Sequence, residues 1–237
     1  MTDPRTIPSP NIWHWPEIYE AENLAQDADG NIPRYLRAVV PWAGRVVVDV
    51  GCGTGFHLPD FAADASRVIG VEPHEPLREA AATRVSGLHN VEVVAGHAES
   101  LPLPDSSVDL VHARTAYFFG VGAGPGITEA LRVLTPGGSL VVVDLDVSSS
   151  PYGDWMRADL PKYNCSAVEA FFEAQGFALT RVDTRWRFSD RRTMREVLGI
   201  EFTRRTAARA ARSIPGLGFD VRYRVHVRHK PAGIELA

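Results

Sequence analysis

Short apolar runs that alternate with helical patterns fill the middle of the chain. The runs begin at Val46–Val50 and recur at Val68–Val71, Val91–Ala95, Val108–Val111 and Leu140–Leu145. Between them, apolar residues follow a helical spacing over 57–65, 74–86 and 126–134. Continuous Val/Ile/Leu runs are typical of buried parallel strands, and strands that alternate with helices indicate βαβ units. The pattern therefore predicts a parallel sheet with helices on both faces.

The N-terminal part lacks such runs. Residues 1–16 contain four prolines, so we expect no regular helix there. Helical patterns follow at 17–26 and 33–40.

The C-terminal part shows a third pattern. After a helical stretch at 163–176, residues 176–188 and 218–230 alternate between apolar and polar positions, as half-exposed strands do. A helical pattern at 190–212 separates them. Two such strands predict an antiparallel hairpin at the edge of an otherwise mostly parallel α/β sheet.

The first apolar run contains one acid and ends in three glycines. Asp49 lies within the run, where a carboxylate is costly unless a polar group interacts with it. Gly51, Gly53 and Gly55 follow at alternate positions, and glycines allow a sharp turn and a close approach of a ligand to the main chain. We interpret this segment as a strand that ends in a ligand-binding loop.

The glycine spacing favours one nucleotide-type ligand over another. The dinucleotide fingerprint G-x-G-x-x-G would place its third glycine where this chain has Phe56, which argues against NAD. Glu72 ends the second apolar run, 21 residues after Gly51, where a carboxylate can accept hydrogen bonds from both hydroxyls of a ribose.

Four blocks together resemble the class I S-adenosylmethionine-dependent methyltransferases, in the branch that acts mostly on small molecules and quinones. They are VVVDVGCGTG, VIGVEP, VVAGHAESLPLPDSSVDLVHAR and EALRVLTPGGSLVVVD, in the order and spacing of that family. The resemblance covers about residues 45–146. It implies a Rossmann-like, seven-stranded sheet whose last two strands form the C-terminal antiparallel hairpin. It also implies a single methyltransferase domain over 1–237, with an N-terminal lid or helical segment at 1–44 and a C-terminal part at 147–237.

The resemblance assigns cofactor-binding roles by position. The glycine loop with Cys52 would hold the methionyl moiety of S-adenosylmethionine, and Asp49 would support its ammonium group. Glu72 would bind the ribose. Pro73, His97, Ala98 and Glu99 would meet the adenine, and Arg114 would lie near the methionyl group. The family commonly has an acid at the position of His97, and a neutral histidine can also accept a hydrogen bond.

Aromatic residues and histidines are the candidates for the acceptor side. His14 and Tyr19 belong to the aromatic-rich stretch NIWHWPEIYE, for which we expect a lid that closes over the cofactor. Tyr117, Phe118 and Phe119 follow the fourth apolar run, where the family places residues that face the substrate. His14, Tyr19 and Tyr117 are the predicted catalytic residues, and His112 is expected to be a core residue.

Composition limits the classes of function. The 237 residues are 45% apolar and 23% charged, with a net charge of −4. No apolar run approaches the ~20 residues of a membrane span, and the N-terminus lacks the apolar core of a signal peptide. The two cysteines suggest neither a disulfide nor a metal cluster, so we expect a reduced cytoplasmic protein without a metal. Residues 181–230 hold 14 Lys/Arg against 5 Asp/Glu, but no aromatic-basic alternation supports a nucleic-acid partner.

Three functions remain open at this point. The leading interpretation is a methyltransferase that uses S-adenosylmethionine, releases S-adenosylhomocysteine and methylates O, N or C of a small molecule. The alternatives are a nicotinamide-dependent oxidoreductase and a cofactor-binding regulatory protein without transferase activity. The sequence also leaves a homodimer open.

Overall fold

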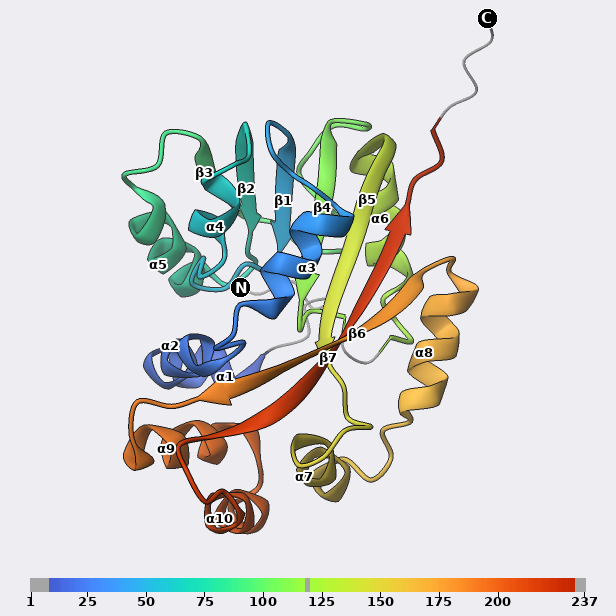
Figure 1. The fold of residues 1–237 in the computed structure, drawn as a ribbon. Coiled ribbons are helices and arrows are strands. Elements are labelled where there is room, and N and C mark those ends of the chain that lie inside the picture. The colour runs from blue at the N-terminus through green and yellow to red at the C-terminus, as the bar shows by residue number, and fades with distance from the viewer. Residues whose placement is uncertain (1–8, 118–119, 233–237) are drawn as a thin grey trace, which may run out of the picture.

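A seven-stranded sheet organises the protein, whose computed structural model describes residues 9–117 and 120–232 (Figure 1). The strand order is β3-β2-β1-β4-β5-β7-β6. The parallel strands are β1 (Val46–Val50), β2 (Arg67–Val71), β3 (Val91–Val94), β4 (Val108–Arg114) and β5 (Leu134–Leu145). β7 (Gly218–His229) pairs antiparallel with both β5 and β6 (Ala178–Arg187). The predicted fold class, including the C-terminal hairpin, is confirmed.

Helices cover both faces of this sheet. Apolar residues of α3 (Asn31–Val39), α4 (Leu58–Ala62) and α5 (Glu75–Val85) pack on one face, and those of α6 (Gly124–Val133) and α8 (Cys165–Ala174) on the other. The central strands are buried on both sides, which explains why they read as continuous valine runs rather than as alternation. The loops at their carboxyl ends are therefore held by a rigid scaffold.

The N-terminal part differs from the prediction. Residues 10–14 form α1 (Pro10–His14) and are followed by α2 (Pro16–Ala25), although we expected no regular helix before residue 17. Each helix has its proline at the first position, where the missing N–H costs nothing and the fixed φ favours a helix. The prolines thus begin helices here instead of preventing them.

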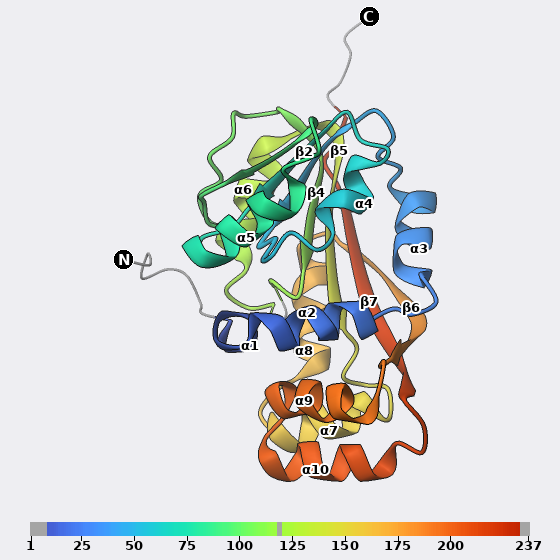
Figure 2. The same ribbon diagram turned by 90° about the vertical axis from the view of Figure 1, so that its left-hand side faces the viewer.

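The C-terminal part contains a group of three helices at one end of the molecule. These are α7 (Tyr152–Asp159), which the sequence pattern did not predict, α9 (Arg191–Glu201) and α10 (Arg204–Ser213). The expected helix at 190–212 is divided into two by the break between Glu201 and Arg204, where Asp159 accepts hydrogen bonds from the backbone and hydroxyl of Thr203. Figure 2 shows that α1 and α2 lie between this group and the rest of the sheet domain.

Strand β5 contains a glycine-rich irregularity near its start. The segment Thr135–Gly138 belongs to β5, at the irregularity where the β4–β5 register shifts between Val108 and Leu110. Gly137 has a φ of 80° and donates its N–H to Lys230. The two glycines therefore serve chain geometry at a strand irregularity.

Candidate functional site

A cavity of about 380 Å³ opens at the carboxyl ends of β1, β2 and β4. We call it the glycine-loop cavity. Its volume lies in the range of small-molecule sites. It is lined by Ser9, Pro10, Ile12, Trp13, Val50, Gly51, Gly53, Val71, Glu72, Pro73, Leu77, Gly96, His97, Ala98, Glu99, Arg114, Thr115, Ala116, Tyr117, Gly120, Val121, Gly122 and Ala123.

The glycine loop adopts the backbone that its residues allow. Gly51, Gly53 and Gly55 have φ values of 71°, 56° and 74°, which L side chains rarely adopt. A Cβ on Gly53 would lie 2.8 Å from the Cδ1 of Ile12, so this glycine lets α1 approach the loop. A Cβ on Gly55 would lie 3.1 Å from the Cβ of Ala81 in α5. Gly51 and Gly53 line the cavity, whereas Gly55 serves the contact between the loop and α5.

Glu72 connects the end of β2 to the glycine loop. Its Oε2 accepts from the Gly53 N–H at 2.9 Å, and its Oε1 accepts from the His74 N–H at 2.8 Å. The residue is 4% exposed, and burial raises the pKa of its carboxyl against these two hydrogen bonds. Each carboxylate oxygen can accept more than one hydrogen bond, so both retain capacity toward the cavity. The Glu72 carboxylate can therefore accept hydrogen bonds from two hydroxyl groups of a ligand.

The end of β3 forms another wall of the cavity. His97, Ala98 and Glu99 line it, as does Pro73 beyond β2. Tyr117 also lies on this side: a Cβ on Gly126 would lie 2.7 Å from its hydroxyl and 3.3 Å from the Cβ of Ala98. Burial, followed by the charge of Glu99, raises the pKa of Tyr117. This phenol is therefore neutral and lies on the β3 side of the cavity.

Asp49 and Cys52 lie outside the cavity lining. The Asp49 Oδ1 is 2.7 Å from the His112 Nδ1, and both residues are buried. Asp49 and His112 are register partners in adjacent parallel strands. The sequence could reveal this pair only if the pairing and register of the two strands were known. The acid in the apolar strand is therefore explained by an internal partner, while the support of a ligand ammonium by Asp49 stays a prediction.

Arg114 lines the cavity and links it to α2. Its Nη2 donates to the Gln26 Oε1 at 2.8 Å, and its guanidinium lies 5.1 Å from the ring centroid of Tyr223. The next residue, Thr115, has a φ of 53°, a strained value for a branched side chain that is often found at functional sites. Tyr19 of α2 lies close to the Thr115 side chain, and burial raises the pKa of its phenol.

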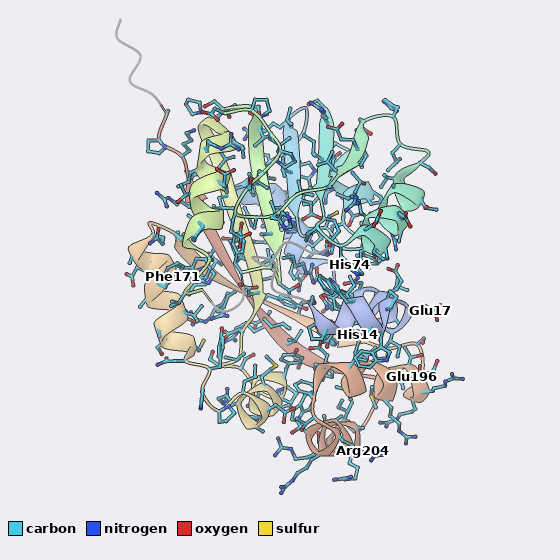
Figure 3. All side chains as sticks on the ribbon, turned by 180° about the vertical axis from the view of Figure 1, so that it is seen from behind. His14, Glu17, His74, Phe171, Glu196 and Arg204 are labelled. Carbon is cyan, nitrogen blue, oxygen red and sulfur yellow. The ribbon has the colours of Figure 1, made fainter. Side chains whose placement is uncertain are left out.

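The two predicted acceptor-side residues of the N-terminal stretch lie in different surroundings. Tyr19 is next to Thr115, whereas His14 is exposed at the end of α1 and does not line the cavity (Figure 3). The residues of α1 that do line it are Ile12 and Trp13, and Trp13 stacks on His74 with ring centroids 4.3 Å apart. The aromatic-rich stretch indicated a closing element, but not which of its rings faces the ligand. Phe118 and Phe119 lie outside the described residues.

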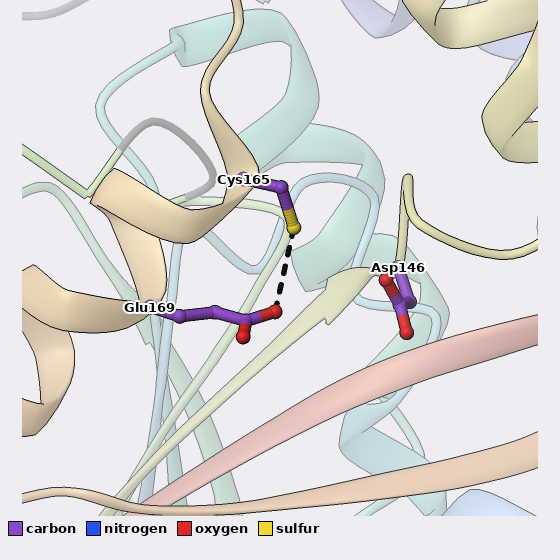
Figure 4. A group of neighbouring side chains, drawn as sticks. All are labelled: Asp146, Cys165 and Glu169. Carbon is purple, nitrogen blue, oxygen red and sulfur yellow. Dashed lines mark hydrogen bonds between the residues drawn. The ribbon is translucent and has the colours of Figure 1, made fainter.

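A group of three side chains away from the cavity has the composition of a metal site. The ligand atoms of Asp146, Cys165 and Glu169 lie within 4.8 Å of one another (Figure 4). However, Arg181 donates to Asp146 at 3.0 Å and to Glu169 at 2.6 Å. A guanidinium already compensates both carboxylates, so we interpret the group as an ion-pair network.

Within residues 9–117 and 120–232, no helix is long and apolar enough to cross a bilayer.

Comparisons with known proteins define the class of this domain. Residues 48–142 match a family model described as a methyltransferase domain. A demethylmenaquinone methyltransferase from Clavibacter sepedonicus is 32% identical over 149 residues, which are 58% of this chain and 61% of that relative. The matches cover between 32% and 63% of the length of the first curated relatives.

Solved structures share the fold. An S-adenosylmethionine-dependent methyltransferase from Thermotoga maritima has a TM-score of 0.62 at 20% identity and covers 93% of this chain and 98% of its own. The cyclase SpnF has a TM-score of 0.57 at 24% identity, with 88% and 84% covered.

Residues 48–142 therefore match a methyltransferase domain, which confirms the family resemblance of the sequence. The matched segment runs from β1 to β5 and includes the ends of β1, β2 and β4, where the glycine-loop cavity opens.

Proposed function

We propose that this protein transfers a methyl group from S-adenosylmethionine to a small-molecule acceptor. The observation that carries the proposal is the Glu72 carboxylate, which lines the cavity while it is tied to the glycine loop through the Gly53 N–H. This arrangement holds a carboxylate that can bind two hydroxyl groups next to a glycine backbone that a ligand can approach closely. The demethylmenaquinone methyltransferase relative supports a small acceptor molecule.

The residues present fit the cofactor. Glu72 would hold the ribose hydroxyls, Gly51 and Gly53 would border the methionyl moiety, and the β3 side of the cavity would enclose the adenine. We place Tyr117 on this adenine side because it lies beside Ala98, and this replaces its predicted catalytic role. When bound, S-adenosylmethionine supplies an electrophilic methyl group on a sulfonium.

The chain's own contribution is mainly placement. Ile12 and Trp13 close the cavity from the side of α1, and a closed cavity excludes water and orients the reactants. Tyr19 and Thr115 border the carboxyl end of β4, where we propose that the acceptor enters. With its pKa raised by burial, Tyr19 is a neutral hydrogen-bond donor rather than a base.

A thermal-shift experiment with three ligands tests the cofactor assignment. S-adenosylhomocysteine should raise the melting temperature by mass action, whereas NAD and NADP should leave it unchanged. A shift with NAD and none with S-adenosylhomocysteine would favour the nicotinamide-dependent oxidoreductase instead.

A second function has one observation in its favour. The fold of this chain also occurs in the cyclase SpnF, whose name describes no methyl transfer. A protein that binds the cofactor without transferring its methyl group would show the thermal shift but would form no S-adenosylhomocysteine with any acceptor. Mass spectrometric detection of S-adenosylhomocysteine, with catechols, quinols and amines as acceptors, distinguishes the two.

A further inference from the structure

Two glutamates meet where the N-terminal helices contact α9. Glu22 belongs to α2 and is 2% exposed, and Glu201 is the last residue of α9. Their carboxyl groups lie close enough to interact by charge, and by a hydrogen bond when one of them carries a proton. The views of Figures 1 and 2 agree that α2 lies directly beside α9. A buried contact between two acids is unfavourable unless they share a proton.

In the part of the chain that the structure describes, the other hydrogen bonds of the two glutamates leave one carboxylate oxygen without a donor. Glu201 accepts from the Asn11 Nδ2 at 2.7 Å and from the Tyr152 hydroxyl at 2.5 Å. Glu22 accepts from the Gln26 Nε2 at 2.8 Å through Oε1, while its buried Oε2 has no other donor among the described residues. A proton between the two carboxyl groups satisfies this oxygen.

The surroundings favour a single negative charge on the pair. Burial raises the pKa of Glu22, and the charge of Glu201 raises it further. Burial also raises the pKa of Glu201. Arg114 of β4 is a nearby cation, and it donates to Gln26. The phenols that face the pair come from α2, α7 and β7; burial raises the pKa of each, so they are neutral: Tyr19, Tyr152 and Tyr223.

The pair connects the wall of the cavity to the distal helices. Asn11 of α1 donates a hydrogen bond to Glu201, and Glu22 of α2 interacts with Glu201 by charge. Helix α1 also carries Ile12 and Trp13, which line the cavity. The placement of Ile12 over Gly53 therefore depends on a contact with α9 that lies outside the cavity. We call α1 and α2 together the N-terminal lid.

We propose that the proton shared by Glu22 and Glu201 latches the N-terminal lid onto α9, and that loss of this proton opens the lid at alkaline pH. The latch deepens the proposed function, because it rests on the glycine-loop cavity being the cofactor site. The proton is part of the closed arrangement, so closure and proton binding are linked.

The sign of the linkage follows from the raised pKa values. The stabilisation of the closed lid is complete below the ordinary glutamate value of 4.5 and is lost as the pH rises through the raised pKa of the pair. Above that pKa, the closure equilibrium falls about tenfold per pH unit, because one proton is released on opening. A neutral amide at position 22 would donate to Glu201 at every pH.

Hydrogen exchange of the ligand-free protein tests the latch. We would compare wild type, Glu22→Gln and Glu17→Gln at pH 6 and pH 9, in peptides covering residues 11–25. Glu17 lies on the same helix but is exposed, which makes it the matched control (Figure 3). A comparison between variants at one pH removes the intrinsic pH dependence of exchange.

The latch predicts equal exchange of the three proteins at pH 6. At pH 9, wild type and Glu17→Gln should exchange faster than Glu22→Gln, by about tenfold for each pH unit above the raised pKa of the pair. Equal exchange of wild type and Glu22→Gln at pH 9 would overturn the proposal. If Glu22→Gln does not fold, judged by circular dichroism, Glu201→Gln is measured instead with the same expectation. No ligand is present, so this result is independent of whether the cavity binds S-adenosylmethionine.

Discussion

Asp144 lies in β5 and Asp146 directly follows the end of that strand, yet their surroundings shift their pKa values in opposite directions. Burial raises the pKa of Asp144 to about 7, although the Arg224 guanidinium opposes the shift. Burial acts on Asp146 in the same way, but hydrogen bonds from Ser148 and the charge of Arg181 hold its pKa below the usual range. Asp144 is 0% exposed, and neither of its oxygens has a hydrogen-bond partner among the described residues.

The two aspartates should therefore affect stability with opposite pH dependence. The contribution of Asp144 is complete below about 3.8 and is lost as the pH rises through about 7. Relative to Asp144→Asn, wild type should lose up to about 1.4 kcal/mol of unfolding free energy per pH unit over this window. Urea denaturation at pH 5 and pH 8 measures the difference.

Asp146→Asn is the matched comparison. The lowered pKa means that Asp146 contributes stability above pH 3.8 and loses it as the pH falls, so the variant should be less stable than wild type at pH 8. If Asp144→Asn were destabilised at pH 8 as much as Asp146→Asn, Asp144 would be a charged partner of Arg224 at that pH and the account would be wrong.

At the scale of elements, the glycine loop and α1 are in contact through Gly53 and Ile12. Gly53 and Gly44 both have positive φ values, but a Cβ on Gly44 would touch nothing within 4 Å. Alanine at either position should cost about 1–2 kcal/mol of stability, because both would adopt a left-handed backbone. Only Gly53→Ala should also weaken the binding of S-adenosylhomocysteine, because it alone moves Ile12. Equal affinities of the two variants, measured by calorimetry, would mean that the loop does not border the ligand.

The N-terminal lid allows a similar paired test. Trp13 stacks on His74 and lines the cavity, whereas Trp15 is 46% exposed. Trp13→Ala should weaken S-adenosylhomocysteine binding by about 0.5–1.5 kcal/mol or more, the value of an aromatic pair beyond its buried area. Trp15→Ala should bind as wild type does. Similar losses in both variants would indicate that the helix, rather than the Trp13 ring, determines affinity.

At the scale of the whole molecule, the sequence predicted the sheet well and the two ends less well. Continuous valine runs and long alternating strands identified β1 to β7, because burial on one or two faces leaves a direct signal in the residue pattern. The same pattern could not distinguish prolines that begin helices from prolines that prevent them, so α1 was missed. It also missed α7, whose Tyr152 and Trp155 pack against Phe202, the residue that follows α9.

The candidate site was predictable in part for the same reason. Gly51, Gly53 and Glu72 follow directly from strand ends, and all three line the cavity. The partners of Asp49 and Glu22 come from β4 and α9, far away along the chain, and only the assembled fold brings them together. Local patterns contain no information on such pairs.

The central claim is that Glu72 holds a ribose in the glycine-loop cavity, and titration calorimetry with S-adenosylhomocysteine tests it most directly. Glu72→Ala should bind about 10–100-fold more weakly than wild type, which corresponds to the ~1.5–3 kcal/mol of hydrogen bonds to a charged group. Glu75→Ala is the control, because Glu75 is exposed at the start of α5, three residues further on, and should bind as wild type does. Equal affinity of all three proteins, or no binding of S-adenosylhomocysteine by wild type, would contradict the account.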